Sequence, residues 1–162
     1  MLKGSLLITL YENLRWKTIS PQGFREEMLA YLPNESNSLL FSMALSYLGD
    51  CQRIFPSDSR PLEQVLWKIV TTNPVSQHRL QAFRLYRSIA DSEEAVQRLY
   101  TLWQERKAPK DCTLSESDYI GLSYMLAMHL PEKADKIIAT QLSRIQNPDR
   151  KKEYQFISPS VS

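Results

Sequence analysis

Residues 37–55 read NSLLFSMALSYLGDCQRIF, and their apolar side chains recur three and four positions apart. This spacing predicts one face of an α-helix. The residues expected on that inward face are Leu39, Leu40, Met43, Ala44, Tyr47, Leu48, Cys51, Ile54 and Phe55. Asn37 or Ser38 is the expected N-cap, because its side-chain oxygen can accept a hydrogen bond from a free N–H group of the first turn.

The same periodicity continues on both sides of this stretch, and strand-like alternation is not convincing anywhere. We expect about eight helices, over residues 2–14, 21–31, 38–55, 61–70, 80–89, 91–103, 115–127 and 131–145, with one more turn or two over 149–156. The expected inward face of the first helix is Leu2, Leu6, Leu7, Leu10, Tyr11 and Leu14.

Residues typical of helix N-termini support several of these helix boundaries. Ser20 is placed to cap a helix whose first residue is Pro21, where the missing N–H costs nothing. Asp91 is the expected N-cap of the helix over 91–103, with Glu94 in the capping-box position, and Ser115 with Asp118 predicts a second capping box.

Short loops between these helices make consecutive helices antiparallel neighbours. We therefore predict an all-α fold, an irregular superhelical stack of antiparallel helical hairpins like a degenerate HEAT or ARM α-solenoid. The chain has 162 residues, and we see no internal boundary, so residues 1–162 are expected to form a single helical domain.

Composition excludes several function classes. The 20 basic and 18 acidic residues leave a net charge of +2, which gives no long-range field to attract nucleic acid or an anionic membrane. The basic run 150–152 is expected on a solvated helix face. No run approaches the ~20 apolar residues that span a bilayer, so we expect a soluble chain.

Catalytic and metal-binding motifs are not found. His78 and His129 have no partner at metal-ligand spacing and are interpreted as surface or cap residues. Cys51 and Cys112 are interpreted as small buried or half-buried residues. Carboxylate neighbours fit first turns and exposed faces: Glu26 with Glu27, Glu93 with Glu94, and Glu116 with Asp118. We predict no catalytic, cofactor-binding or metal-ligating residue in this chain.

Three tryptophans could line a ligand groove, but basic residues do not interleave with them. Trp16, Trp67 and Trp103 are therefore expected to pack in the core.

Both ends of the chain resemble motifs of a known family. Residues 147–159 read NPDRKKEYQFISP, which is similar to the N-P-D-R-K-x-x-F-x-F-x-x-P-A-L-S stretch of the C-terminal helical domain of the aminopeptidase N family. Near the other end, residues 7–21 resemble the family's L-x-E-x-x-x-x-x-x-x-S-P helix pair, and residues 32–37, LPNESN, resemble its L-P-x-E-x-D connector. The departures are Tyr154 for Phe, and Ser160-Val161 for Ala-Leu.

The resemblance implies a function for a longer polypeptide. Members of this family are zinc metallopeptidases that remove N-terminal residues from peptides, and they bind zinc through an H-E-x-x-H helix and a downstream Glu in an upstream domain. None of those residues is in this sequence. Their helical domain encloses the active-site chamber and limits access to it. The resemblance thus implies a non-catalytic piece of such a domain, with the catalytic domain of the same polypeptide and peptide substrates as partners and zinc in the parent enzyme.

Two alternatives remain open. The chain could be a free-standing helical-repeat scaffold that binds another protein, or a small helical enzyme whose site has no known motif. The sequence does not fix the compartment, although we favour the cytoplasm over the periplasm.

We predict that the isolated chain self-associates, because a solenoid cut at its ends exposes apolar surface, here Leu2, Leu6 and Leu10. Light scattering over a wide concentration range measures this, and a constant monomer mass would contradict it.

Overall fold

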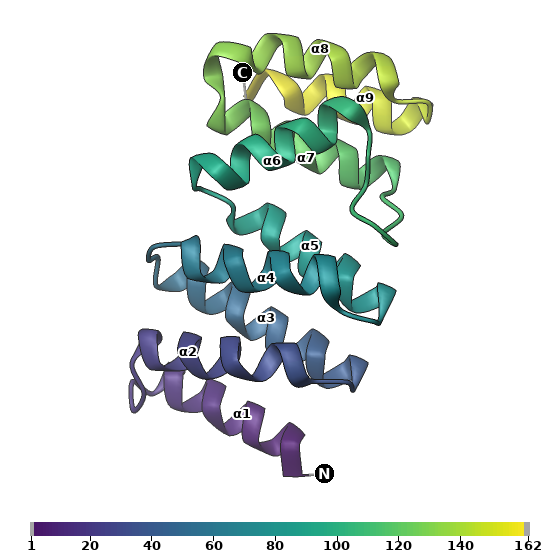
Figure 1. Ribbon diagram of the computed structural model, residues 1–162. Coiled ribbons are helices and arrows are strands. Elements are labelled where there is room, and N and C mark those ends of the chain that lie inside the picture. The colour runs from purple at the N-terminus through teal and green to yellow at the C-terminus, as the bar shows by residue number, and fades with distance from the viewer. Residues whose placement is uncertain (1, 161–162) are drawn as a thin grey trace. The chain divides into compact units, whose positions relative to one another are not determined.

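The structure, a computed structural model, describes residues 2–160, with side chains from Gly4 onward (Figure 1). These residues form nine α-helices and three short 3-10 helices, with no strand among them. The predicted all-α class is therefore confirmed. The chain divides into two compact units, Met1–Ile89 and Ala90–Ser162. That all 162 residues form one domain with superhelical stacking remains a prediction.

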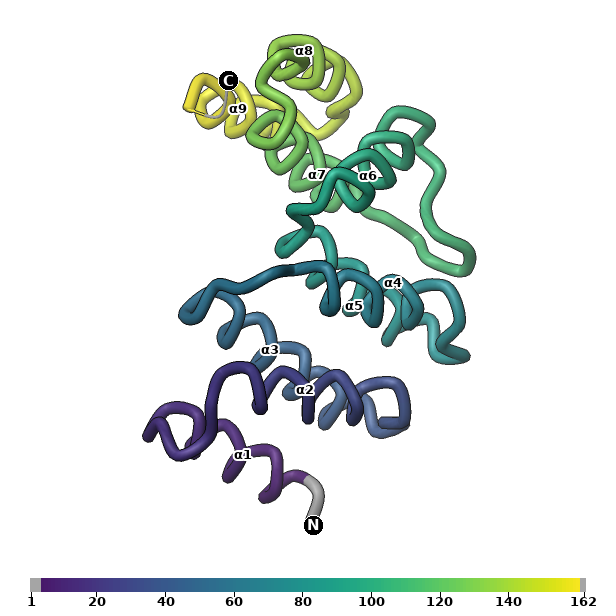
Figure 2. Tube along the Cα trace, turned by 60° about the vertical axis from the view of Figure 1, so that its left-hand side comes forward, coloured from purple at the N-terminus to yellow at the C-terminus, as the bar shows by residue number. Residues whose placement is uncertain are grey.

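The first unit contains five α-helices and one 3-10 helix. They are α1 (Leu2–Arg15), α2 (Pro21–Tyr31), η1 (Leu32–Asn34), α3 (Ser38–Ile54), α4 (Arg60–Thr72) and α5 (Ser76–Ile89). The trace reverses direction between successive helices, as Figure 2 shows. α1 and α2 pack against each other and against α3, α4 packs against α5, and α5 also contacts α3.

The core of the first unit lies between these helices. Its fully buried side chains come from every helix after α1: Phe24, Met28, Leu32, Phe41, Ala44, Leu48, Cys51, Leu66, Val70, Ala82, Phe83 and Tyr86. Leu7 and Leu14 attach α1 to this core. Each helix therefore buries one apolar stripe, which supplies most of its stabilisation.

The second unit contains α6 (Glu93–Glu105), α7 (Glu116–His129), η2 (Pro131–Lys133), α8 (Ala134–Arg144), α9 (Pro148–Ile157) and η3 (Ser158–Ser160). α7 packs against both α6 and α8, and α9 contacts α8. The core contains Ala95, Leu99, Trp103, Tyr119, Leu122, Leu126, Ile137 and Tyr154.

Most predicted caps are present. Ser20 accepts a hydrogen bond from the Gly23 N–H at 3.0 Å, and Asn37 accepts from Leu39 and Leu40. Ser115 and Asp118 form the predicted capping box. The prediction for Asp91 is wrong: the N-cap is Ser92, whose hydroxyl accepts from the Ala95 N–H at 3.2 Å, so the helix begins one residue later than Asp91 would allow.

The stretch over 149–156 forms more structure than one or two turns. It belongs to α9, a 10-residue helix that is capped by Asn147 and begins at Pro148. Asn147 accepts hydrogen bonds from the N–H groups of Asp149 and Arg150 at 3.0 and 3.1 Å. A strong N-cap followed by Pro at the first helical position is enough to start a helix that tertiary contacts then retain.

Several residues predicted to point inward are exposed. Leu39 and Ile54 of α3 are 70% and 57% exposed, and Leu6 of α1 is 66% exposed. Leu39 lies nine positions before the buried Leu48, which at about 100° per residue places it on the opposite side of the helix. The apolar arc of α3 is thus wider than the stripe its neighbours cover. Leu10 is half-buried, and the Leu2 side chain lies outside the described residues.

The tryptophan predictions have different outcomes. Trp103 is buried, and Trp67 is half-buried with its ring centroid 5.2 Å from that of Tyr86. Trp16 is 77% exposed, so its predicted core position is wrong. It follows the last residue of α1 and lies in the turn before α2, where the helices of the first unit do not cover it.

Among the described residues, every helix falls short of the length and apolar character needed to cross a bilayer.

Two leucines on one helix test this burial pattern. We expect Leu48→Ala, at a fully buried position, to lower the free energy of unfolding by about 2–5 kcal/mol through lost burial and a residual cavity. Leu39→Ala is the matched control and should change it by less than about 0.5 kcal/mol. Urea denaturation followed by circular dichroism measures both. Equal losses would contradict the assigned face of α3.

Candidate functional site

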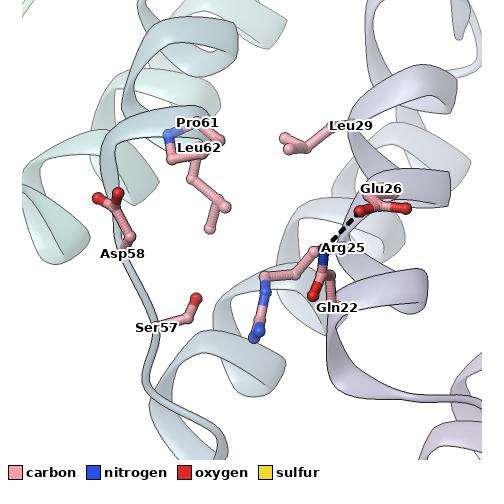
Figure 3. A pocket seen from close by; sticks show the side chains of 8 residues that line it. All are labelled: Gln22, Arg25, Glu26, Leu29, Ser57, Asp58, Pro61 and Leu62. Atoms are coloured by element: carbon pink, nitrogen blue, oxygen red, sulfur yellow. Dashed lines mark hydrogen bonds between the residues drawn. The ribbon is translucent and has the colours of Figure 1, made fainter.

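The candidate site is a pocket of the first unit, between α2 and the segment that leads into α4 (Figure 3). α2 contributes Gln22, Arg25, Glu26 and Leu29, which share one helix face because they are three and four positions apart. The other wall consists of Ser57 and Asp58 from the loop after α3, and of Pro61 and Leu62 from the first turn of α4. Leu29 points across the pocket toward Pro61 and Leu62.

Arg25 is anchored at the base of this pocket. Its Nη1 donates a hydrogen bond to the carbonyl of Phe55 at 3.0 Å and lies 3.6 Å from the Sγ of Cys51. The guanidinium therefore ties α2 to the C-terminal end of α3. Burial raises the pKa of the Cys51 thiol, and the Arg25 charge opposes that shift only in part. Cys51 thus stays a neutral thiol at physiological pH, which does not suit a nucleophile.

Charges of both signs border the pocket. The Asp58 carboxylate accepts from both Nε and Nη2 of Arg60, and these hydrogen bonds lower its pKa. On the opposite wall, the Gln22 side-chain amide donates to Glu26 at 2.9 Å, as the dashed line in Figure 3 marks. The apolar side chains of Leu29, Pro61 and Leu62 together with this polar border suit an amphipathic ligand.

The pocket has a volume of about 280 Å³. That is slightly below the ~300–1,000 Å³ of sites that enclose a drug-sized molecule. The space therefore fits a single amino-acid side chain or a ligand of similar size. The sequence carries no signal for this pocket, because residues 22–29 and 57–62 come together only when α3 folds between them.

His78 belongs to a buried polar cluster at the junction of α2, α3 and α5. Its ring is fully buried and stacks on Phe41 with centroids 4.1 Å apart, and its Nε2 is hydrogen-bonded to the Ser38 hydroxyl at 3.0 Å. Nearby, the buried Glu35 accepts hydrogen bonds from the Tyr31 hydroxyl and the Asn37 N–H. The interpretation of His78 as a surface residue is wrong, because α3 covers its ring.

The other residues singled out from the sequence are held by structural contacts. His129 is exposed, and its Nδ1 lies 2.9 Å from the Met125 carbonyl. Cys51 is buried and Cys112 is half-buried, which confirms their interpretation as packing residues. Glu116 accepts from the Gln146 N–H and pairs with Arg150, while Glu94 pairs with Arg98. Within the described residues, no three His, Cys, Asp or Glu side chains are grouped so that they could hold a metal ion.

Fold and contacts together define this molecule as an all-α protein of helical hairpins with a small amphipathic pocket. No family model matches the chain, and no curated protein or solved structure matches it either. The resemblance to the aminopeptidase N family therefore rests on the sequence motifs alone.

Because His78 is buried, we predict that the folded protein loses stability in acid. Burial lowers the pKa of His78, although the Glu35 charge opposes this. In the unfolded chain the imidazole takes up a proton as the pH falls through about 6.5, whereas folded His78 stays neutral to lower pH. The unfolded state then binds more protons, so the free energy of unfolding should fall below this pH.

Urea denaturation at several pH values between 5 and 8 measures that dependence. His78→Gln should flatten it. An unchanged slope in the His78 variant would contradict the assignment.

Proposed function

We propose that this chain is a non-catalytic part of the helical domain of a zinc aminopeptidase, an enzyme that removes N-terminal residues from peptides. In this proposal its partner is the catalytic domain of the same polypeptide, and its helices form part of the wall that limits peptide access to the active site.

The proposal is supported by the structural roles of the motif residues. In the NPDRK segment, Asn147 caps α9, and Arg150 pairs with Glu116 of α7 at 3.2 Å. Tyr154 is fully buried, and its hydroxyl is hydrogen-bonded to Ser123 at 2.9 Å. The residues behind the resemblance thus attach α9 to the rest of its unit, which is what a shared helical domain requires.

The motif residues near the N-terminal end also have structural roles. Ser20 and Pro21 start α2, Leu32 is fully buried, and Glu35 binds the Tyr31 hydroxyl and the Asn37 N–H. The L-P-x-E connector therefore shapes the turn from α2 into α3. Tyr154, where the family has Phe, keeps an aromatic ring at a packing position.

The described residues do not fit a zinc ion. They contain no cluster of three metal-binding side chains, and the Nε2 of His78 is already bonded to Ser38. In the proposed enzyme, zinc and the groups that activate water belong to the catalytic domain. This chain contributes walls such as the α2–α4 pocket, which could accommodate one side chain of a peptide.

The coding sequence around this chain tests the proposal. We expect an upstream H-E-x-x-H motif followed, after 18 residues, by Glu in the same reading frame. The full-length product should bind one zinc ion and cleave aminoacyl anilides, whereas the isolated chain should do neither. Zinc analysis and chromogenic peptidase assays measure both properties.

A start codon after an untranslated leader at residue 1 would contradict the proposal and favour the free-standing scaffold. Peptidase activity in the isolated chain would contradict it as well.

A further inference from the structure

Two arginines of the second unit meet at the C-terminal end of α6. Arg144, the last residue of α8, donates hydrogen bonds to the carbonyls of Trp103 and Gln104 at 3.0 and 3.2 Å. Its guanidinium carbon lies 4.9 Å from the centroid of the Trp103 ring. The guanidinium carbon of Arg106 lies 5.3 Å from the centroid of the Tyr119 ring. Aromatic faces therefore hold both planar groups in place.

The positive charges of Arg106 and Arg144 act on each other. Burial lowers the pKa of Arg144, and the charge of Arg106 lowers it further. Among the described residues, no carboxylate lies within 4.0 Å of either guanidinium, whereas Arg98 and Arg150 in the same unit each have one. Two neighbouring cations without a counter-ion favour the binding of an anion.

A tyrosine hydroxyl completes the cluster. Tyr119 is 8% exposed, and burial raises the pKa of its hydroxyl, which therefore remains protonated. The charges of Arg106 and Arg144 act to lower that pKa, whereas the charge of Asp118 raises it. Within the described residues the hydroxyl forms no hydrogen bond, so its proton is available to a ligand.

The backbone of Arg106 is unusual for an arginine. Its φ of 54° is left-handed, and it ends α6 with hydrogen bonds from its own N–H to Trp103 and from the Lys107 N–H to Leu102. Glycine is the preferred residue at this position of such a helix end, because a Cβ is disfavoured there. The arginine thus stands where backbone geometry alone would favour glycine.

The helix end itself does not cancel the positive charge. The C-terminus of a helix carries about half a negative charge, whereas the two guanidiniums carry two positive charges. The carbonyls of Trp103 and Gln104 are already bonded to Arg144. The helix end thus offsets only part of the charge of the two guanidiniums.

We propose that Arg106, Arg144 and Tyr119 form a binding site for a phosphate group, either as free phosphate or as a phosphate monoester. Guanidinium forks match phosphate oxygens in bidentate geometry, and a protonated hydroxyl adds a third donor. A dianion neutralises both arginine charges, which a single carboxylate does not. This inference does not depend on the proposed peptidase function.

Titration of the whole chain with inorganic phosphate and with phenyl phosphate, at constant ionic strength, tests the site. We expect saturable binding by calorimetry and a shift of the Trp103 indole N–H resonance. The indole resonances of Trp16 and Trp67, which lie in the other unit, are internal references. Stronger binding of phenyl phosphate identifies an organic monoester as the ligand, and equal binding identifies free phosphate.

The Arg106→Gly variant distinguishes a loss of phosphate binding from a loss of stability. It should raise the melting temperature, since glycine suits the left-handed backbone, and should weaken phosphate binding by about tenfold or more, the effect of one charge-assisted hydrogen bond. Arg144→Gln should weaken binding at least as much. Lys151→Gln removes a charge from the exposed face of α9 and should leave the affinity unchanged.

Three results would overturn the site: no saturable phosphate binding, equal weakening in the Lys151 variant, or acetate binding as tight as phosphate.

Discussion

Helices as short as those of this chain are marginal in water when they are isolated, and this constraint governs the rest of the structure. They range from 10 residues in α9 to 17 in α3. Below about 15 residues, the range of every described α-helix except α3, a helix gains too few backbone hydrogen bonds to offset its nucleation cost. Each helix must therefore cover an apolar stripe with its neighbours. The core of each unit consists of these apolar stripes packed against one another.

Apolar stripes alone do not specify which helices become neighbours, and buried hydrogen bonds add that specificity. His78 of α5 bonds to Ser38 of α3, Trp103 of α6 to Gln141 of α8, and Tyr154 of α9 to Ser123 of α7. A buried polar group without a partner costs about 1–3 kcal/mol, so a slipped arrangement loses more than the bond itself. These pairs select one packing of otherwise similar apolar surfaces.

The candidate pocket and the proposed phosphate site lie at the edges of these packed stripes. The α2–α4 pocket remains beside Leu29, which is half-buried, with Arg25 fixed at its base. In the second unit, Arg144 satisfies the last carbonyls of α6 and thereby places its charge beside Arg106. Both features arise from side chains that also stabilise the fold. The motif residues of α9 also stabilise the fold, because Arg150 and Tyr154 hold that helix in place.

The sequence by itself determined the helices and most of their caps, including Ser20, Asn37 and Ser115 with Asp118. These features depend on residues within a few positions of one another, which a linear pattern displays fully. Only the tertiary structure decided that Leu39 and Trp16 are exposed, that His78 is buried, and that residues 22–29 face residues 57–62. Burial depends on which neighbour covers a face, and that neighbour is supplied by another part of the chain.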